Sequence, residues 1–167
     1  MLVFNPELVA LNVEAPDAAA VIHLLAGKLH AQGLVSADYG QQTCARETQH
    51  PTGLPTTPFC IAFPHADATG VQQSALALAI LKTSVVFKNM ADPDEALPVD
   101  LVLMLANKSP EEQIQTLCNL ALLFGQPDQL VMLRGQTDPV AAAAWLSEAL
   151  GLNQPPPATA ATLDGPD

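Results

Sequence analysis

A histidine placed at the end of an apolar run is the clearest candidate for chemistry in this chain. His65 follows Pro64, directly after the apolar residues 59–63. A buried strand fixes the position of its last residue, and the proline ring restricts the backbone that leads to the histidine. An imidazole held in this way suits phosphoryl or proton transfer. Because a histidine at a strand end is also a common structural residue, the surrounding residues must distinguish the two roles.

Two residues that precede His65 in the sequence could take part in the same chemistry. Arg46 lies at the end of a predicted helix, and His50 opens the irregular stretch 51–58. A cation at a helix C-terminus gains from the helix dipole, which explains Arg46 without any further function. Its guanidinium could also hold phosphate oxygens in a fork geometry if the fold brings it to His65.

The other candidate polar groups are interpreted as structural. His23 and His30 lie within the first predicted helix, so a position at the surface or in helix packing is expected. The run of Asp92, Asp94 and Glu95 lacks the spacing of a calcium-binding loop and is interpreted as a solvated loop. The sequence contains no glycine-rich phosphate loop and no cluster with metal-ligand spacing. Neither a metal nor a cofactor is therefore expected.

Composition and charge limit the class of protein. The chain has 167 residues, of which 49% are hydrophobic, so one domain with a substantial core is predicted. The formal net charge of −11 argues against nucleic acid and anionic membranes as partners, since both require a basic surface. No apolar segment is long enough to span a bilayer, and the first residues do not resemble a secretory signal. A cytoplasmic protein is expected.

The three cysteines do not form a recognisable framework. Cys44, Cys60 and Cys118 are far apart in the sequence, and their odd number argues against a set of disulfides or a zinc site. Cys60 and Cys118 fall on apolar stretches, so both are expected as small residues of the core. This usage is typical of a reducing compartment.

The first half of the chain predicts two helices followed by a strand that ends at His65. Asp17 is a suitable cap for the first helix, and Gly33 ends it. The apolar spacing of this helix predicts a core face formed by Val21, Leu24, Leu25 and Leu29. The remaining expectations are a helix over 36–48, a loop without regular structure over 51–58, a strand at 59–63 and a turn at 67–70.

The second half predicts three strands and then helices. Apolar residues on both faces of 75–80 indicate a strand that is covered on both sides. Further expectations are strands at 85–87 and 99–106, a polar loop at 89–97, a short helix or extended piece at 130–133 and a closing helix at 139–150. A helix from Pro110 to the Gly125 stop is predicted to bury Ile114, Leu117, Cys118, Ala121 and Phe124.

The alternation of strands and helices predicts an α/β (α+β) fold, in which helices flank a mixed β-sheet in one layered sandwich. Residues 1–150 are expected to form this domain. Residues 151–167 are rich in Pro, Ala and Thr, and they are interpreted as a flexible tail or linker.

Several spaced motifs together resemble the enzyme IIA (EIIA) domain of the bacterial sugar phosphotransferase system, in the type 2 or fructose/mannitol superfamily. These are Ala45-Arg46-Glu47, Pro51-Thr52-Gly53-Leu54 and Ile61-Ala62-Phe63-Pro64-His65, followed by Pro98-Val99-Asp100-Leu101-Val102 and Glu112-Gln113-Ile114-Gln115. The resemblance covers roughly residues 1–150. The Pro-Thr-Gly-Leu stretch is most similar to the galactitol-type branch.

The resemblance implies a phosphocarrier. The histidine-containing phosphocarrier protein (HPr) would transfer a phosphoryl group to His65, and the domain would pass it to a cysteine of an enzyme IIB (EIIB). The membrane permease, enzyme IIC (EIIC), would then import and phosphorylate a sugar. Arg46 and backbone amides near Ala66 and Asp67 would stabilise the transferred group. The second ring nitrogen of His65 is expected to bind a hydrogen-bond acceptor.

The sequence departs from the family pattern at three positions. Mannitol- and fructose-type members often carry a second histidine where this chain has Gln113, whose amide could still donate to a phosphate oxygen. His50 replaces an aromatic residue and could supply a second imidazole. Asp67 would repel phosphate if it pointed inward, so it is expected to face away or to orient a partner. A regulatory module of the nitrogen-related type, and a domain that keeps only the fold, remain alternatives.

Overall fold

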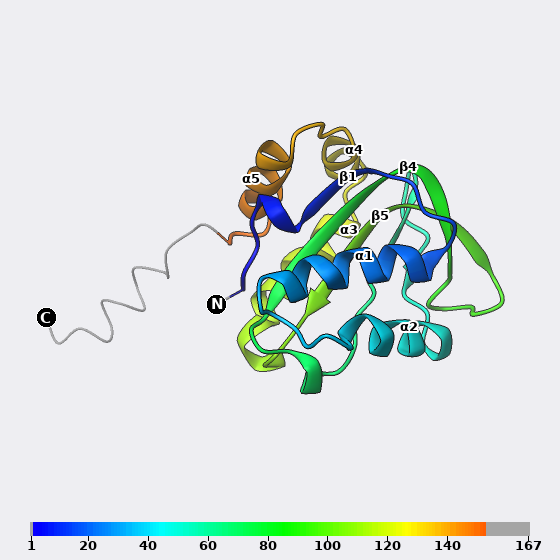
Figure 1. Ribbon diagram of the computed structural model, residues 1–167. Helices are drawn as coiled ribbons and strands as arrows, with labels where there is room; N and C mark the ends of the chain where they lie inside the picture. Colours follow the sequence, from blue (N-terminus) through cyan, green and yellow to red (C-terminus); the bar gives the residue numbers. More distant parts are fainter. Residues whose placement is uncertain (1, 153–167) are drawn as a thin grey trace, which may run out of the picture.

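The computed structural model describes residues 2–152, and these residues form a mixed five-stranded sheet with helices on both faces (Figure 1). The predicted α/β layered fold is therefore confirmed. Most of the predicted tail lies outside the described residues. The strands are β1 (Val9–Val13), β2 (Gly53–Leu54), β3 (Cys60–Ala62), β4 (Ala75–Lys88) and β5 (Ala96–Ala106). The helices are α1 (Ala18–Ala31), α2 (Tyr39–Gln49), α3 (Ile114–Phe124), α4 (Pro127–Arg134) and α5 (Pro139–Ala149), with short 3-10 turns η1 (Pro6–Leu8), η2 (Ala68–Gly70) and η3 (Pro110–Gln113).

The strand order places the end of β3 next to the end of β5. The sheet runs β1-β4-β5-β3-β2, in which β3 is parallel to β5 and β4 is antiparallel to β5. Because two parallel strands end at the same edge of a sheet, the segment that follows β3 lies beside the end of β5. His65 is in that segment, three residues beyond the last residue of β3.

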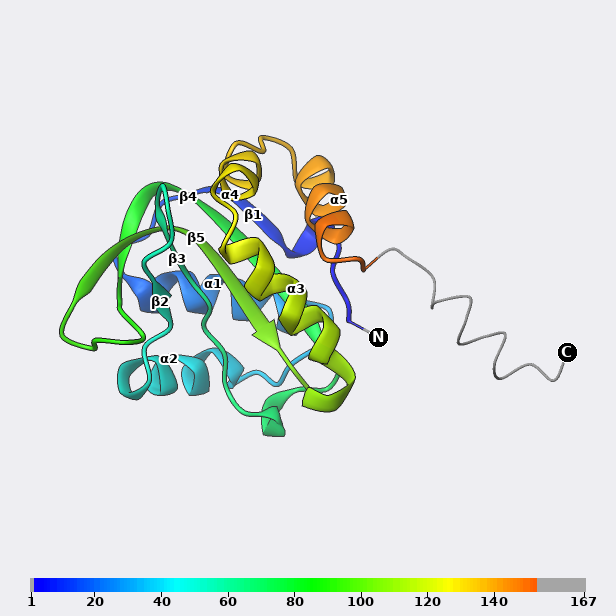
Figure 2. The same ribbon diagram turned by 180° about the vertical axis from the view of Figure 1, so that it is seen from behind.

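Helices cover both faces of the sheet, and β4 contributes to both cores. Helices α1 and α2 lie on one face, and α3, α4 and α5 lie on the other (Figures 1 and 2). Successive side chains of a strand point to opposite faces, so the alternation of small and large residues in β4 divides between the two layers. The predicted period of two is confirmed. Ala75, Ala77 and Ala79 pack toward α1, and Leu76, Leu78 and Ile80 pack toward α3–α5.

Helix α1 begins and ends where its sequence signals predict. The side chain of Asp17 accepts a hydrogen bond from the amide of Ala20 at 2.9 Å, and Gly33 adopts a positive φ of 73° just after the helix. The predicted core face is correct except at one position, because Leu24 is 40% exposed while Ile22 is fully buried. The buried stripe follows the helical period, and Leu24 lies just beside it.

Helix α2 begins at Tyr39, three residues later than the predicted start at Ser36. The hydroxyl of Ser36 donates to Asp38, and its amide donates to the carbonyl of Gly70. Both bonds hold Ser36 outside the helix, since a polar side chain can satisfy the backbone locally instead of helically.

Two predictions for the sheet were wrong. The proline-rich stretch 51–58 contains a short strand, β2, which pairs antiparallel with β3. Its prolines flank the paired residues, and Gly53 lies so close to the carbonyl of Lys88 that a side chain would collide there. The strands expected at 75–80 and 85–87 form the single strand β4, whose register against β5 shifts between Ile80 and Val85.

The predicted buried face of the helix at 110–124 was only partly correct, because Leu117 and Phe124 pack against the core but Ala121 is exposed. Residues 110–113 form the 3-10 turn η3, and the buried stripe of the α-helix that follows runs through Leu117, Leu120 and Leu123 at helical spacing. Leu120 and Leu123 are the buried residues of α3, whereas Ile114 is 59% exposed. Cys118 is exposed and is not the core residue that was expected, whereas Cys60 is half-buried and packs against the core.

The C-terminal helices complete the second layer. The predicted closing helix is confirmed as α5, and the short stretch at 130–133 is part of α4. The carboxylate of Asp138 caps α5 by accepting from the amide of Ala141 at 2.9 Å. No helix within residues 2–152 is long and apolar enough to cross a membrane.

Candidate functional site

His65 is held by a hydrogen bond that determines which ring nitrogen is available. Its Nδ1 lies 3.0 Å from the carbonyl oxygen of Phe63. A carbonyl only accepts, so this bond requires the proton on Nδ1 and leaves Nε2 with its lone pair. The side chain is half-buried, and the ring of Phe63 lies tilted against it with centroids 6.0 Å apart. The expectation that a backbone acceptor would hold one ring nitrogen is therefore confirmed.

Arg46 borders two shallow hollows beside the histidine. One hollow of 300 Å³ is lined by Arg46, His50 and His65, together with Met90 and Pro93 from the turn between β4 and β5. The other, of 270 Å³, is lined by Arg46 and by Ala66, Asp67, Gln42 and Thr69. The fold thus brings together, around one guanidinium, the residues at 46, 50 and 65–67 that the sequence singled out.

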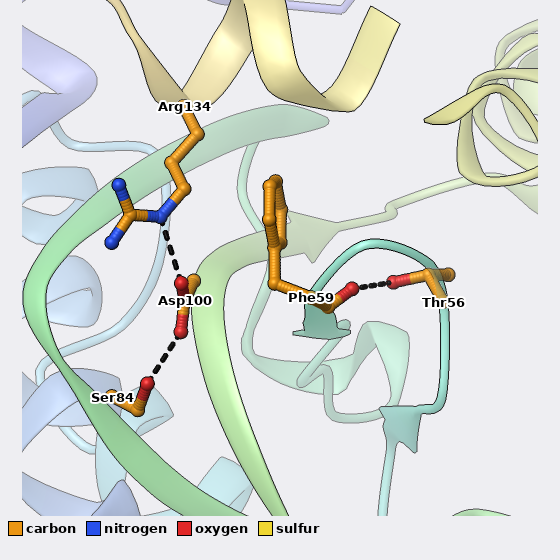
Figure 3. A network of polar contacts seen from close by, with 5 residues as sticks. All are labelled: Thr56, Phe59, Ser84, Asp100 and Arg134. Carbon is orange, nitrogen blue, oxygen red and sulfur yellow. Dashed lines mark hydrogen bonds and ion pairs between the residues drawn. The ribbon is translucent and has the colours of Figure 1, made fainter. Parts of the chain in front are cut away.

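The guanidinium of Arg46 is exposed, and within residues 2–152 it has no hydrogen bond or ion pair. Arg134, the chain's other arginine, is used structurally instead. Figure 3 shows it reaching from α4 to β5, where its Nε donates to Asp100 at 2.8 Å and its guanidinium lies 5.7 Å from the ring of Phe59. Asp100 also accepts from Ser84 at 2.5 Å. Arg46 is therefore the arginine that is available to an incoming anion.

A buried tyrosine anchors the backbone just after the histidine. The hydroxyl of Tyr39 donates to the carbonyl of Leu105 at 3.2 Å and accepts from the amide of Ala66 at 3.2 Å. Tyr39 is fully buried, and this burial raises the pKa of its hydroxyl above the ordinary value. The tyrosine ties the segment after β3 to the end of β5. The Tyr39 hydroxyl already binds the amide of Ala66. The next amide along the chain, that of Asp67, makes no hydrogen bond to the described residues.

We expect Tyr39→Phe to lower both stability and the rate of any reaction at His65. The substitution leaves the buried carbonyl of Leu105 and the amide of Ala66 without their partner, at a cost of about 1–3 kcal/mol. Thermal unfolding measures the first effect and a single-turnover rate the second. Thr48→Val is the control, because the hydroxyl of Thr48 bonds the carbonyl of Cys44 within the same helix. It should not slow the reaction, and an equal loss of rate in both variants would contradict a specific role for Tyr39.

A second network approaches His65 from helix α2. The Oε2 and Oε1 atoms of Glu47 accept from the amide and the hydroxyl of Thr52, at 2.9 and 2.8 Å. The hydroxyl and carbonyl oxygens of Thr52 both accept from the amide of Phe63, at 3.2 and 3.3 Å. Burial raises the pKa of Glu47, although the bonds from Thr52 and the nearby imidazole of His65 oppose that shift.

The other predicted site residues, Asp67, Gln113 and His50, differ in burial and in hydrogen bonding. Asp67 is exposed, and its carboxylate accepts from the amide and hydroxyl of Thr69, which together with Arg46 lower its pKa. Gln113 ends η3, beyond the C-terminal end of β5, and is only 3% exposed. Its side chain makes no hydrogen bond within the described range. His50 is exposed at the end of α2, where its amide donates to the carbonyl of Arg46 at 2.6 Å.

Sequence reasoning missed Tyr39, Glu47 and Thr52 as parts of the site. Each lies in a segment that the sequence analysis did identify, but their partners are 5 to 66 residues away in the chain. The available signal was the presence of Glu47 beside Arg46 and of Thr52 beside Gly53 in two of the sequence motifs.

The acidic residues Asp92, Asp94 and Glu95 lie in the turn between β4 and β5, as predicted, and Glu95 accepts from Asn89 at 2.7 Å. No group of three His, Cys, Asp or Glu side chains in the described chain is placed to hold a metal ion.

Comparison with known families supplies the decisive observation. The family described as "Phosphoenolpyruvate-dependent sugar phosphotransferase system, EIIA 2" matches residues 2–149. The chain belongs to this family. The resemblance drawn from its motifs is therefore confirmed, and this EIIA domain is a phosphotransferase component.

Two relatives are similar to this EIIA domain in sequence, and one is described as a transport component and the other as a transcriptional regulator. The galactitol-specific EIIA component of Escherichia coli K12 is 32% identical over 112 residues, which cover 67% of this chain and 74% of that protein. The transcriptional regulator ManR of Bacillus subtilis is 33% identical over 136 residues, which cover 80% of this chain but 19% of that protein.

Solved structures share the fold. The mannitol enzyme IIA of E. coli, in its complex with phosphorylated enzyme IIB, superposes with a TM-score of 0.68 at 20% identity, over 92% of this chain and 100% of that one. The nitrogen regulatory protein IIA-Ntr of Neisseria meningitidis has a TM-score of 0.68 at 25% identity, over 84% of this chain and 94% of that one.

Proposed function

We propose that this EIIA domain carries a phosphoryl group on Nε2 of His65, accepts it from HPr and passes it to a cysteine of an EIIB. The observation that carries this proposal is the bond from Nδ1 of His65 to the carbonyl of Phe63. A nucleophilic imidazole must present a lone pair, and this bond assigns the lone pair to Nε2.

The transfer consists of two balanced displacements. In the first, Nε2 of His65 forms a bond to phosphorus while the phosphorus–nitrogen bond of the donor histidine breaks. In the second, a cysteine thiolate of EIIB forms a phosphorus–sulfur bond while the bond to Nε2 breaks. Phosphoryl transfer depends mainly on positioning and on charge stabilisation around a loose transition state. The fixed imidazole supplies the first requirement, and the free guanidinium of Arg46 supplies the second.

The other site residues have supporting roles in this proposal. The amide of Asp67 donates to a phosphate oxygen, because the amide of Ala66 is bonded to Tyr39. The carboxylate of Asp67 is held by Thr69 and balances Arg46 until phosphate arrives. Gln113 donates its unpartnered side-chain amide to phosphate, and exposed His50 contacts the partner protein at the rim of the hollow.

The comparisons support the proposed partners and substrate class without showing them directly. The galactitol-specific relative supports a role in uptake of galactitol or a similar sugar, with the permease EIIC as the downstream membrane component. Cytoplasmic HPr and EIIB require a cytoplasmic EIIA. The acidic chain, with its net charge of −11, favours a basic docking surface on the proteins that meet it.

Intact-mass spectrometry after incubation with phosphoenolpyruvate, enzyme I and HPr tests the proposal. We expect one acid-labile phosphoryl group per chain, added only when HPr is present. Adding a galactitol-type EIIB should discharge it to the EIIB cysteine. Failure to phosphorylate the chain, or phosphorylation at another residue, would contradict the phosphocarrier function.

A regulatory role is the second candidate, favoured by the match of most of this chain to part of ManR. In that case the chain would be phosphorylated at His65 and would control a binding partner according to its phosphorylation state. The same experiment separates the two roles, because a regulatory domain accepts the phosphoryl group but does not discharge it to a galactitol-type EIIB.

A further inference from the structure

Glu47 is a half-buried carboxylate that lies behind the proposed site and does not line the hollow that contains His65. It follows Arg46 directly on α2, so the two side chains leave the helix about 100° apart. Arg46 faces the two hollows beside the histidine. Glu47 lines a different hollow of 350 Å³, with Ala18, Val86 and Phe87 among its other lining residues.

Hydrogen bonds to the amide and to the carbonyl of Phe63 connect Glu47 to the imidazole through the backbone of that residue. Both carboxylate oxygens accept from Thr52, the oxygens of Thr52 accept from the amide of Phe63, and the carbonyl of Phe63 accepts from Nδ1 of His65. Every bond in the series is between 2.8 and 3.3 Å long. Since Thr52 holds Phe63 by its amide, the direction of the Phe63 carbonyl depends on Thr52, and Thr52 depends on Glu47.

The charge of Glu47 also interacts electrostatically with the histidine. When Nε2 bonds phosphorus while Nδ1 keeps its proton, the ring gains a positive charge. Glu47 is near enough to interact with the His65 imidazole through space. The other charged groups around it are Arg46, the preceding residue on α2, and Lys88, which lines the same apolar hollow from β4. Glu47 is therefore an acidic group that interacts with the His65 ring and is held in place by hydrogen bonds from Thr52.

We propose that Glu47 is a positioning residue for phosphoryl transfer, which acts through Thr52 and Phe63 to keep the proton on Nδ1 of His65 and balances the charge of the phosphorylated ring. This inference rests on the proposed function and deepens it. In the transfer step the Nε2–phosphorus bond forms as the donor's nitrogen–phosphorus bond breaks, and the proton stays on Nδ1. Glu47 neither gives nor receives an atom.

Two readouts of the full chain test this inference. Long-range ¹⁵N–¹H NMR of the unphosphorylated protein reports which nitrogen of His65 carries the proton, and single-turnover transfer from phosphorylated HPr reports the rate. The variants are Glu47→Gln, Thr52→Val and Thr52→Ser, with Glu148→Gln at an exposed position of α5 as the matched control.

We expect Glu47→Gln and Thr52→Val to populate both tautomers of His65 and to slow transfer about tenfold, with the KM for HPr unchanged. Thr52→Ser restores the hydroxyl, so it should keep the Nδ1–H tautomer and a rate within about twofold of the parent. Glu148→Gln should change neither readout. Retention of the Nδ1–H tautomer and the full rate in both Glu47→Gln and Thr52→Val would overturn the inference.

The pH dependence of stability tests the burial of the Glu47 carboxylate. The raised pKa means that the folded protein binds the Glu47 proton more tightly than the unfolded chain does. The contribution of Glu47 to stability is therefore complete below the ordinary glutamate pKa, and it is lost as the pH rises through the raised value. Glu47→Gln lacks this loss, so its melting temperature relative to the parent should increase from pH 4.5 to pH 7.

A structural role alone would change the melting temperature of Glu47→Gln but leave the His65 tautomer and the transfer rate unchanged, and that outcome would overturn the inference. The NMR measurement needs no phosphoryl donor. If the parent protein is not phosphorylated by HPr, the phosphocarrier function fails, while the tautomer measurement still decides the role of Glu47.

Discussion

His65→Asn should abolish phosphorylation of the chain and leave its fold intact. The amide of asparagine can donate to the carbonyl of Phe63 in place of Nδ1, so the local hydrogen bond survives. The nucleophilic Nε2 has no counterpart in asparagine, and covalent transfer is therefore lost completely. Intact-mass spectrometry after incubation with phosphorylated HPr should show no phosphoryl group, and circular dichroism should show a native melting curve.

Two further variants make this result specific to the nucleophile. His65→Ala should give the same loss of phosphorylation, with a lower melting temperature because the carbonyl of Phe63 also loses its partner. His23→Ala, at an exposed position on α1, should be phosphorylated like the parent chain. Acid-labile phosphate on His65→Asn would assign the nucleophile to another residue.

Replacing Arg46 should slow phosphoryl transfer with little effect on stability. Its guanidinium has no partner within residues 2–152, so Arg46→Leu should change the free energy of unfolding by less than about 0.5 kcal/mol. A charge that stabilises the transferring group is typically worth a factor of about 10²–10³ in rate. Arg46→Lys keeps the charge but loses the fork geometry, so we expect an intermediate rate. Rapid-quench transfer from phosphorylated HPr measures all three rates.

Arg134 provides the matched control, because its environment predicts the opposite pattern. It is held by Asp100 and packs over Phe59, as Figure 3 shows, so Arg134→Leu should lower the melting temperature. The rate of transfer in this variant should remain that of the parent, since Arg134 lines neither hollow beside His65. A normal rate in Arg46→Leu would remove Arg46 from the proposed mechanism.

The sequence determined those features that depend on local chemistry. The Asp17 cap, the Gly33 stop and the period of two in β4 each follow from residues close together in the chain, and each is confirmed. His65 was identifiable for the same reason, because a Pro-His pair after an apolar run restricts a short segment. The order of its motifs was sufficient to place the chain in its family.

Other features were decided only by the tertiary structure. The buried face of α3 was decided by the core against which the helix packs, because apolar residues stand on more than one side of this segment. The pairing of β2 required β3 to lie beside it, and the merging of two expected strands into β4 required the register of β5. These outcomes depend on contacts between segments that are distant in the sequence.

The candidate site also combines features that the sequence determined with features that only the tertiary structure decided. Sequence alone identified the histidine, the arginine and the segment that follows the histidine. Only the fold placed the hydroxyl of Tyr39 between Leu105 and Ala66, and only the fold linked Glu47 through Thr52 to the backbone of Phe63. Sequence determines which groups can do chemistry, whereas the state of each group depends on its neighbours in space. The carbonyl of Phe63 fixes the proton on Nδ1 of His65, and burial by the folded chain raises the pKa of Glu47.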